Sequence, residues 1–108
     1  MAGNEQSEPV KTWLRQSAEL RTLFDRGVEQ QLESDRKLVS ARWSPDQNRS
    51  DELERQSETI LSDYVNNTKP AIRNLASQMG FNSDAIFNAI KEEFEKKRAE
   101  AERSSRGR

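Results

Sequence analysis

The sequence of 108 residues contains no histidine and no cysteine. Histidine is the commonest general acid or base, and cysteine supplies thiolate nucleophiles and many zinc ligands. No glycine-rich phosphate-binding loop occurs, so catalysis would have to rest on carboxylates such as Glu92, Glu93 and Glu95. These glutamates lie in a run of alternating charge that is typical of a solvated helix face. We therefore predict no enzyme activity, no catalytic residues, no cofactor, no metal site and no small-molecule substrate.

Apolar residues are also scarce, because 31% of the residues are hydrophobic and 34% are charged, with a mean hydropathy of -1.10. A chain of this length buries only a modest part of its surface, and this composition approaches that of disordered segments. Long amphipathic helices relieve the shortage when they share an interface with a partner. We therefore expect one small protein that forms a homo-oligomer or binds an obligate protein partner.

Neither an export signal nor a membrane span is visible. The first eight residues are polar and lack the apolar core of a secretory signal peptide. No apolar run approaches the length that a transmembrane helix needs. The 18 basic and 19 acidic residues give a net charge of -1, so no overall field favours nucleic acid. A cytoplasmic protein with no membrane partner is the simplest interpretation.

Helical periodicity begins after a polar, disordered segment over residues 1–8. A first helix is predicted from Pro9 to Trp43, with Ser7 as its N-cap. At about 100° per residue its apolar side chains occupy an arc of roughly 200°, which is wider than a coiled-coil seam. These side chains are Val10, Trp13, Leu14, Leu20, Leu23, Phe24, Val28, Leu32, Leu38, Val39 and Trp43. The helix is therefore expected to contact more than one neighbour.

The segment Ser44-Pro45-Asp46-Gln47 marks the clearest boundary in the chain. The residue before a proline is disfavoured in helical geometry, so the first helix should end near Trp43. Ser44 is then the predicted N-cap of a second helix, Pro45 its first residue and Gln47 the partner in a capping box. The second helix is predicted to extend to about residue 66 and to fold back on the first as an antiparallel hairpin.

A second break is predicted over residues 66–70, followed by a short helix from Pro70 to Met79. Gly80 can adopt the left-handed conformation that ends a helix, and Asn82 or Ser83 can cap a last helix to about residue 102. The apolar faces of these two helices are Leu75, Ala76 and Met79, then Ile86, Phe87, Ile90 and Phe94. The fold class is therefore predicted to be all-α. Its predicted parts are a disordered N-terminus (1–8), a helical hairpin (9–66), a helix-turn-helix-like unit (67–102) and a basic tail (103–108).

The residues Leu75-Ala76, Met79-Gly80-Phe81 and Ile86 resemble the helix-turn-helix signature of small DNA-binding regulators over residues 71–90. This resemblance implies a groove-facing side with Ser83, Asp84, Phe87, Asn88 and Lys91, in which Asn88 reads adenine and Lys91 meets phosphate. The same helix carries Asp84, Glu92, Glu93 and Glu95, and acidic groups oppose the phosphate contacts on which affinity for DNA depends.

Two further resemblances involve shorter motifs. Met79-Gly80-Phe81 followed by Ala89-Ile90 resembles the loop and second helix of ubiquitin-associated domains, which implies that Met79 and Phe81 dock on ubiquitin. The two helices joined at Trp43-Ser44-Pro45 are similar to secreted helical hairpins whose turn reads Trp-x-Gly, with proline here in place of glycine.

The function that these patterns favour is a non-enzymatic interaction or adaptor protein that self-associates or binds a protein partner through amphipathic helices. The predicted partner interface comprises Trp13, Leu20, Phe24, Val28, Leu32 and Trp43. Packing in the core or in a dimer interface is the expected role of the two tryptophans, and anchoring a partner is the alternative. Replacing Leu20 or Phe24 with aspartate should weaken association and leave the C-terminal helices folded.

The alternative function is a helix-turn-helix transcriptional regulator, with DNA as its partner. The predicted nucleic-acid contacts are Ser83, Asn88, Lys91, Lys96, Lys97 and Arg98.

Overall fold

The computed structural model of the protein describes residues 2–106, and describes side chains over residues 9–103. The elements are α1 (Ala2–Gln16), α2 (Ala18–Trp43), α3 (Gln47–Asp63), the π-helical segment η1 (Tyr64–Thr68), α4 (Lys69–Met79) and α5 (Ser83–Arg106). No strand occurs within residues 2–106, so the predicted all-α class is confirmed. Met1, residues 107–108 and the side chain of Ser7, the predicted cap, lie outside the described parts.

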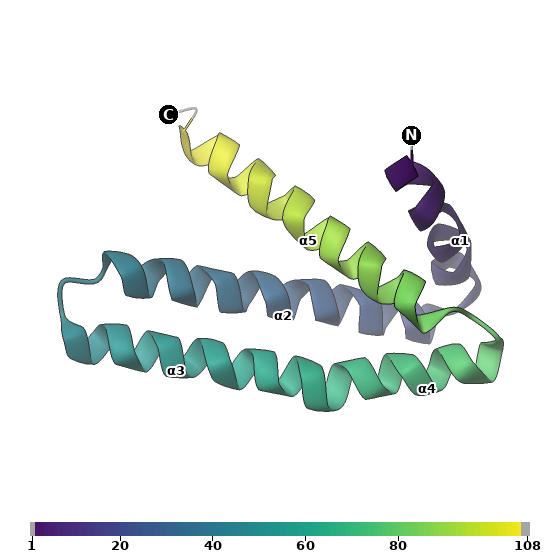
Figure 1. Ribbon diagram of the computed structural model, residues 1–108, viewed down its shortest axis with the longest axis horizontal. Helices are drawn as coiled ribbons and strands as arrows, with labels where there is room; N and C mark the ends of the chain where they lie inside the picture. The colour runs from purple at the N-terminus through teal and green to yellow at the C-terminus, as the bar shows by residue number, and fades with distance from the viewer. Residues whose placement is uncertain (1, 107–108) are drawn as a thin grey trace.

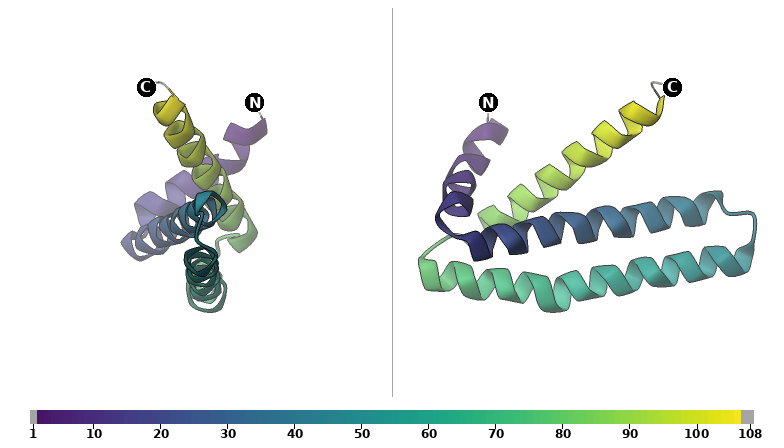
Figure 2. Two further views of the ribbon diagram at one scale, coloured as in Figure 1. Left: turned by 90° about the vertical axis from the view of Figure 1, so that its left-hand side faces the viewer. Right: turned by 180° about the vertical axis from the view of Figure 1, so that it is seen from behind.

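The molecule is built on a long antiparallel pair, with a size of 48 × 33 × 21 Å. Helix α2 packs along a rod formed by α3, η1 and α4 in succession (Figure 1). Helices α1 and α5 pack against α2 at the α4 end of this pair, and α5 diverges from α2 toward its own C-terminus (Figure 2). We call the part of α2 that α1, α4 and α5 reach, residues 20–32, its inner half, and residues 36–43 its outer half.

The predicted first helix is wrong in two respects. Helix α1 begins at Ala2, and Pro9 lies inside it. The chain also leaves helical geometry at Ser17, which has φ -132° and ψ 110°. The hydroxyl oxygen of Ser17 accepts a hydrogen bond from the backbone N–H of Leu20 at 3.2 Å, so Ser17 is the N-cap of a separate helix. The break turns α1 away from the axis of α2, and this lets α1 contact α5.

The hairpin turn was predicted correctly in place but not in its cap. Asp46, not Ser44, is the N-cap of α3, and its carboxylate accepts from the backbone N–H of Asn48 at 3.0 Å. Ser44 instead ends α2, and its backbone N–H donates to the carbonyl of Ala41 at 3.3 Å. A carboxylate caps a helix as well as a hydroxyl does, so the cap could move two residues along, past the proline.

The predicted break over residues 66–70 does not occur. Residues Asp63 and Lys69 both have right-handed helical dihedral angles, and the backbone N–H of Lys69 donates to the carbonyl of Tyr64, five residues earlier. Pro70 has no N–H to donate and its ring crowds the preceding turn. A single π-helical turn accommodates this proline and keeps the rod continuous from Gln47 to Met79. Thr68 is therefore not a cap; its hydroxyl donates to the side-chain oxygen of Gln30 at 2.7 Å.

The turn between α4 and α5 is as predicted. Gly80 has φ 74°, and the backbone N–H of Phe81 donates to the carbonyl of Ala76 at 2.8 Å, which is the pattern of a Schellman motif. The side-chain oxygen of Asn82 accepts from the N–H of Asp84 at 3.0 Å, so Asn82 is the cap of α5. Helix α5 continues to Arg106, so the predicted tail is helical over residues 103–106.

The core lies where α1, α2, α4 and α5 meet. It contains Val10, Leu20, Phe24, Val28, Leu32, Ile72, Ala76, Ile86, Ala89 and Ile90. Met79 was predicted to lie on the apolar face of α4 but is exposed. The fully buried residues of α4 are Ile72 and Ala76. The ring of Trp13 stacks on the ring of Phe81, with 4.7 Å between centroids and 10° between planes. This stack fastens α1 to the turn between α4 and α5.

Polar groups, rather than apolar ones, join α2 to α3 next to this core. The buried hydroxyls of Ser34 and Ser57 lie 2.6 Å apart, and the hydroxyl of Ser57 also donates to the carbonyl of Ser34 at 3.0 Å. Gln30 extends the layer, because it receives the hydroxyl of Thr68 and donates to the carboxylate of Asp63. Among the described side chains, no buried polar atom lacks a hydrogen-bond partner. Such a satisfied layer fixes the register of the two helices.

Candidate functional site: a groove between three helices

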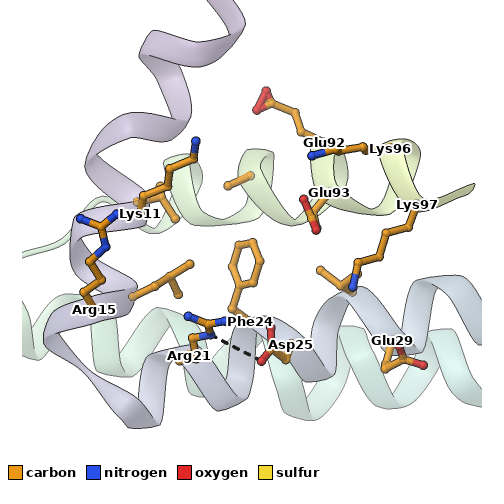
Figure 3. A pocket seen from close by; sticks show the side chains of 14 residues that line it. Lys11, Arg15, Arg21, Phe24, Asp25, Glu29, Glu92, Glu93, Lys96 and Lys97 are labelled. Carbon is orange, nitrogen blue, oxygen red and sulfur yellow. Dashed lines mark ion pairs between the residues drawn. The ribbon is translucent and has the colours of Figure 1, made fainter. Parts of the chain in front are cut away.

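A groove with a volume of about 810 Å³ lies between α1, α2 and α5 (Figure 3). Its apolar lining residues come from all three helices and are Val10, Leu14, Phe24, Val28 and Ala89. Four of these side chains are buried in the core, and Leu14 is half-buried. The ring of Phe24 stands in the middle of the groove, facing α5 (Figure 3). The groove is therefore an opening onto the hydrophobic core, with a floor that can receive an apolar side chain.

Charged side chains of both signs surround this floor. The basic ones are Lys11, Arg15, Arg21, Lys96 and Lys97, and the acidic ones are Asp25, Glu29, Glu92 and Glu93. Arg21 and Asp25 form an ion pair at 3.7 Å, and both side chains are largely exposed. An exposed pair of this kind contributes little to stability, about 0–1 kcal/mol. A mixed rim around an apolar floor suits the surface of another protein better than a polyanion such as DNA.

The acidic side chains of the described part of the chain are dispersed. Among these residues, no group of three or more Asp, Glu, His or Cys side chains could hold a metal ion. Burial raises the pKa of the Tyr64 phenol above its ordinary value of 10.0, and a hydrogen bond with the Gln31 side chain lowers it in part. The ring of Tyr64 and the side chain of Ile90 both lie beside Gly27, so this tyrosine is part of the packed interior and does not line the groove.

The predicted partner interface does not form one surface. Leu20, Phe24, Val28 and Leu32 are buried within the single chain, so they stabilise the fold and are not free to bind a partner through a flat helix face. Of these four residues, only Phe24 and Val28 reach the groove floor. The periodicity placed these residues correctly on an apolar face, but α1, α4 and α5 of the same chain cover that face.

The two tryptophans have different environments. Trp13 is half-buried and stacked on Phe81, as expected for a packing residue. Trp43 is 82% exposed at the end of α2, so it does not pack in the core of the chain, and packing in a dimer interface or anchoring a partner stays a prediction. The helices that cover the inner half of α2 do not extend to Trp43.

The predicted nucleic-acid contacts are not brought together either. Asn88 and Lys91 are exposed on one side of α5, where Asp84 and Glu95 lie at helical spacing on the same side. Ser83 is half-buried at the start of the helix. Lys96 and Lys97 instead line the groove.

Two further residues of the predicted DNA-reading helix have partners within the chain. The guanidinium of Arg98 lies 3.4 Å from the carboxylate of Asp35 on α2. The ring of Phe87 lies under the cations of Lys69 and Arg73, at 4.9 and 5.5 Å from the ring centre. These contacts hold α5 against α2 and α4.

Sequence reasoning missed the α1 wall of the groove and the exposed apolar residues of the long pair. The large exposed apolar side chains are Leu38, Val39, Trp43, Leu61, Val65 and Met79. A signal for the α1 wall was present, because Ser17 is followed by Glu19 in the first turn, as in many helix N-termini.

None of the described helices is both long and apolar enough to cross a membrane. No protein-family model, curated protein or solved structure matches the chain.

Proposed function

We propose that this protein is a cytosolic, non-enzymatic interaction protein that binds a protein partner in the groove between α1, α2 and α5. The observation that carries the proposal is the combination of an apolar floor, centred on Phe24, with a rim of nine charged side chains of both signs. A partner helix with one or two apolar anchors and flanking charges is complementary to such a surface.

The composition supports the same proposal. Histidine and cysteine are absent from the sequence, which removes the side chains most used in catalysis. The groove crosses three helices whose positions are fixed by the core, so its walls are preorganised and little ordering is needed for binding.

DNA binding is the second candidate, and the geometry of the turn between α4 and α5 favours it. Gly80 and Asn82 have the roles that a helix-turn-helix motif requires. The exposed side of α5 carries two carboxylates beside Lys91, which opposes phosphate contact. A titration into labelled duplex at rising salt tests this candidate, because binding through phosphates should weaken steeply with salt, and absence of binding at low salt would exclude it.

Site-specific photo-crosslinking in the native cell tests the groove. A photoreactive residue at Arg15 or Lys97, on the α1 and α5 walls, should give a discrete crosslinked product. The matched control position is Glu54, which is exposed on α3 outside the groove. Adding Leu14→Glu, which puts a charge on the half-buried part of the floor, should remove the product.

Circular dichroism would establish that the Leu14→Glu variant keeps its helices. Crosslinking that is equal from Glu54, or that is insensitive to Leu14→Glu, would contradict the proposal.

A further inference from the structure

One side of α2 carries exposed residues in both of its halves, on either side of Leu32, which falls in the same arc but is buried in the core. At about 100° per residue these residues fall within an arc of about 80°. They are Asp25, Glu29, Arg36, Val39 and Trp43. The row begins at the wall of the groove, which Asp25 and Glu29 line, and ends at the exposed indole of Trp43. An apolar anchor and an apolar groove thus lie on the same side of one helix, at opposite ends.

The charge of α2 is divided between the same two ends. Residues 18–35 contain five acidic and two basic side chains, whereas residues 36–43 contain three basic side chains and no acidic one. A helix with this distribution is complementary to a second copy of itself in the antiparallel direction, and repels a second copy in the parallel direction.

We propose that the partner in the groove is a second copy of this chain, with the two α2 helices antiparallel and Trp43 of each copy in the groove of the other. This inference rests on the proposed function of the groove and names its occupant. The contact is the same on both copies, so it closes as a two-fold dimer.

The positions on α2 define the register of this dimer. If the two-fold axis passes between Leu32 and Glu33, Glu29 of each copy faces Arg36 of the other. The same register sets Trp43 opposite Thr22 of the other copy, beside Arg21 and Phe24 at the groove. The indole then meets the ring of Phe24, and the guanidinium of Arg21 can lie over the indole face.

The energetics of an exposed tryptophan favour such docking. A tryptophan can bury about 150–250 Å² and is among the commonest anchors of protein interfaces.

Sedimentation equilibrium of the full-length protein tests the dimer. The wild-type chain should sediment as a concentration-dependent dimer. Trp43→Ala should raise the dissociation constant at least about thirtyfold, the effect of losing a central aromatic anchor.

Glu29→Arg and Arg36→Glu should each weaken the dimer about tenfold or more, because each sets like charges opposite one another. Glu58→Arg, the matched charge change on the exposed face of α3, should leave the dissociation constant within about twofold.

Charge exchange makes the test specific for this register. In a mixture of the Glu29→Arg and Arg36→Glu chains, both contacts between position 29 of one chain and position 36 of the other regain opposite charges. The mixture should therefore form a heterodimer with affinity close to wild type. Tryptophan emission in a Trp13→Phe background should shift to shorter wavelength on concentration, since Trp43 is then the only tryptophan.

A chain that stays monomeric at all concentrations, with Trp43 fully open to quencher, would overturn the dimer. So would a dimer that is unaffected by Trp43→Ala, or a mixture that is not rescued. If the chain is monomeric and Arg15 still crosslinks to a different protein, the dimer is wrong and the proposed function stands. If neither position crosslinks to anything, both are wrong.

Discussion

Both halves of α2 carry apolar side chains at helical spacing, but these side chains have different surroundings. In the inner half, Leu20 is 0% exposed, and in the outer half Leu38 is 36% and Val39 39% exposed. The rod of α3, η1 and α4 runs along α2, but the core cluster that α2 shares with α1, α4 and α5 contains residues of the inner half and none of the outer half. Just beyond the inner half, the ion pair between Arg98 and Asp35 joins α5 to α2.

This difference shows that an apolar position becomes core only where a second neighbour reaches it. The outer half has one neighbour, α3, which covers Ala41 and leaves the opposite side of the helix open. The same opening exposes Trp43 and leaves the outer half available for contact with another molecule. The inner half therefore contributes most to the stability of the fold, and the outer half leaves apolar surface exposed for contact with another molecule.

Truncating one leucine in each half tests this difference between the halves, and the largest effect on stability is expected here. Leu20→Ala should lower the free energy of unfolding by about 2–5 kcal/mol, because it leaves a cavity in the core. Leu38→Ala should change it by less than about 1 kcal/mol, since that side chain already contacts water. Urea denaturation followed by circular dichroism measures both values. Equal losses would mean that the outer half is as well covered as the inner half.

The same burial corrects the expected effect of aspartate at Leu20 or Phe24. Both side chains belong to the cluster that contains Ile86 and Ile90 of α5. An unpaired carboxylate at either position should unfold the C-terminal helices together with α2, rather than only weaken association.

The sequence was sufficient for the parts of the fold that depend on local chemistry. Gly80 needed a left-handed conformation and Asn82 a cap, and both are found. The break at Ser17 and the continuous rod through Pro70 were missed for a common reason. Each depends on the balance between a local preference and long-range packing. Ser17 caps because α1 gains contacts with α5, and Pro70 is accommodated because the rod gains contacts with α2.

The candidate site was less accessible to sequence reasoning than the fold. Its floor combines Leu14, Phe24 and Ala89, which are far apart along the chain and share no motif. Periodicity identified Leu14 and Phe24 as apolar positions, but assigned them to one continuous face. Only the direction of α1 before Ser17 decides that they border a groove, and that direction follows from tertiary contacts.

The next largest effect is expected where α2, η1 and α5 meet. A Cβ atom at Gly27 would lie 3.0 Å from Cε1 of Tyr64 and 3.2 Å from Cδ1 of Ile90. Both side chains are buried, so Gly27→Ala should cost about 1–3 kcal/mol in strain, offset by about 1 kcal/mol of helix propensity. Thermal unfolding should show a net destabilisation. A stabilised variant would mean that Tyr64 can move away at little cost.

Gly80→Ala provides a contrast with a different cause. A Cβ atom at Gly80 would meet nothing within 4 Å, but the residue has φ 74°. The expected loss of about 1–2 kcal/mol comes from backbone conformation alone. Replacement of Gly80 by Asn, which tolerates the left-handed region, should therefore recover part of the loss, whereas Gly27→Asn should be worse than Gly27→Ala.

A smaller effect is expected from the polar layer between α2 and α3. Ser57→Ala removes the donor to the carbonyl of Ser34 and one partner of the Ser34 hydroxyl, and should cost about 1 kcal/mol. Ser34→Ala should cost a similar amount. The double variant should cost less than the sum of the two, because neither hydroxyl is then left beside an empty position. A double-mutant cycle of urea denaturation measures this coupling, and strict additivity would show that the two hydroxyls act independently.

The smallest expected effect is a dependence on alkaline pH that Tyr64 causes. Its folded-state pKa is raised, first by burial, above the ordinary value of 10.0. Below about pH 10 the phenol is protonated in both states, so its contribution to stability is complete. Above that pH the unfolded chain releases the proton first, and the free energy of unfolding should fall until the folded phenol ionises as well.

Tyr64→Phe keeps the ring beside Gly27 and lacks the proton, so the decrease from about pH 9 to 11 should be shallower in this variant. The two proteins differ in no other titratable group, so the difference between their urea denaturation curves isolates Tyr64, the single tyrosine of the chain. Identical slopes would mean that the phenol of Tyr64 is as open to solvent as that of an unfolded tyrosine, which would also loosen the contact of η1 with α2 on which the continuous rod depends.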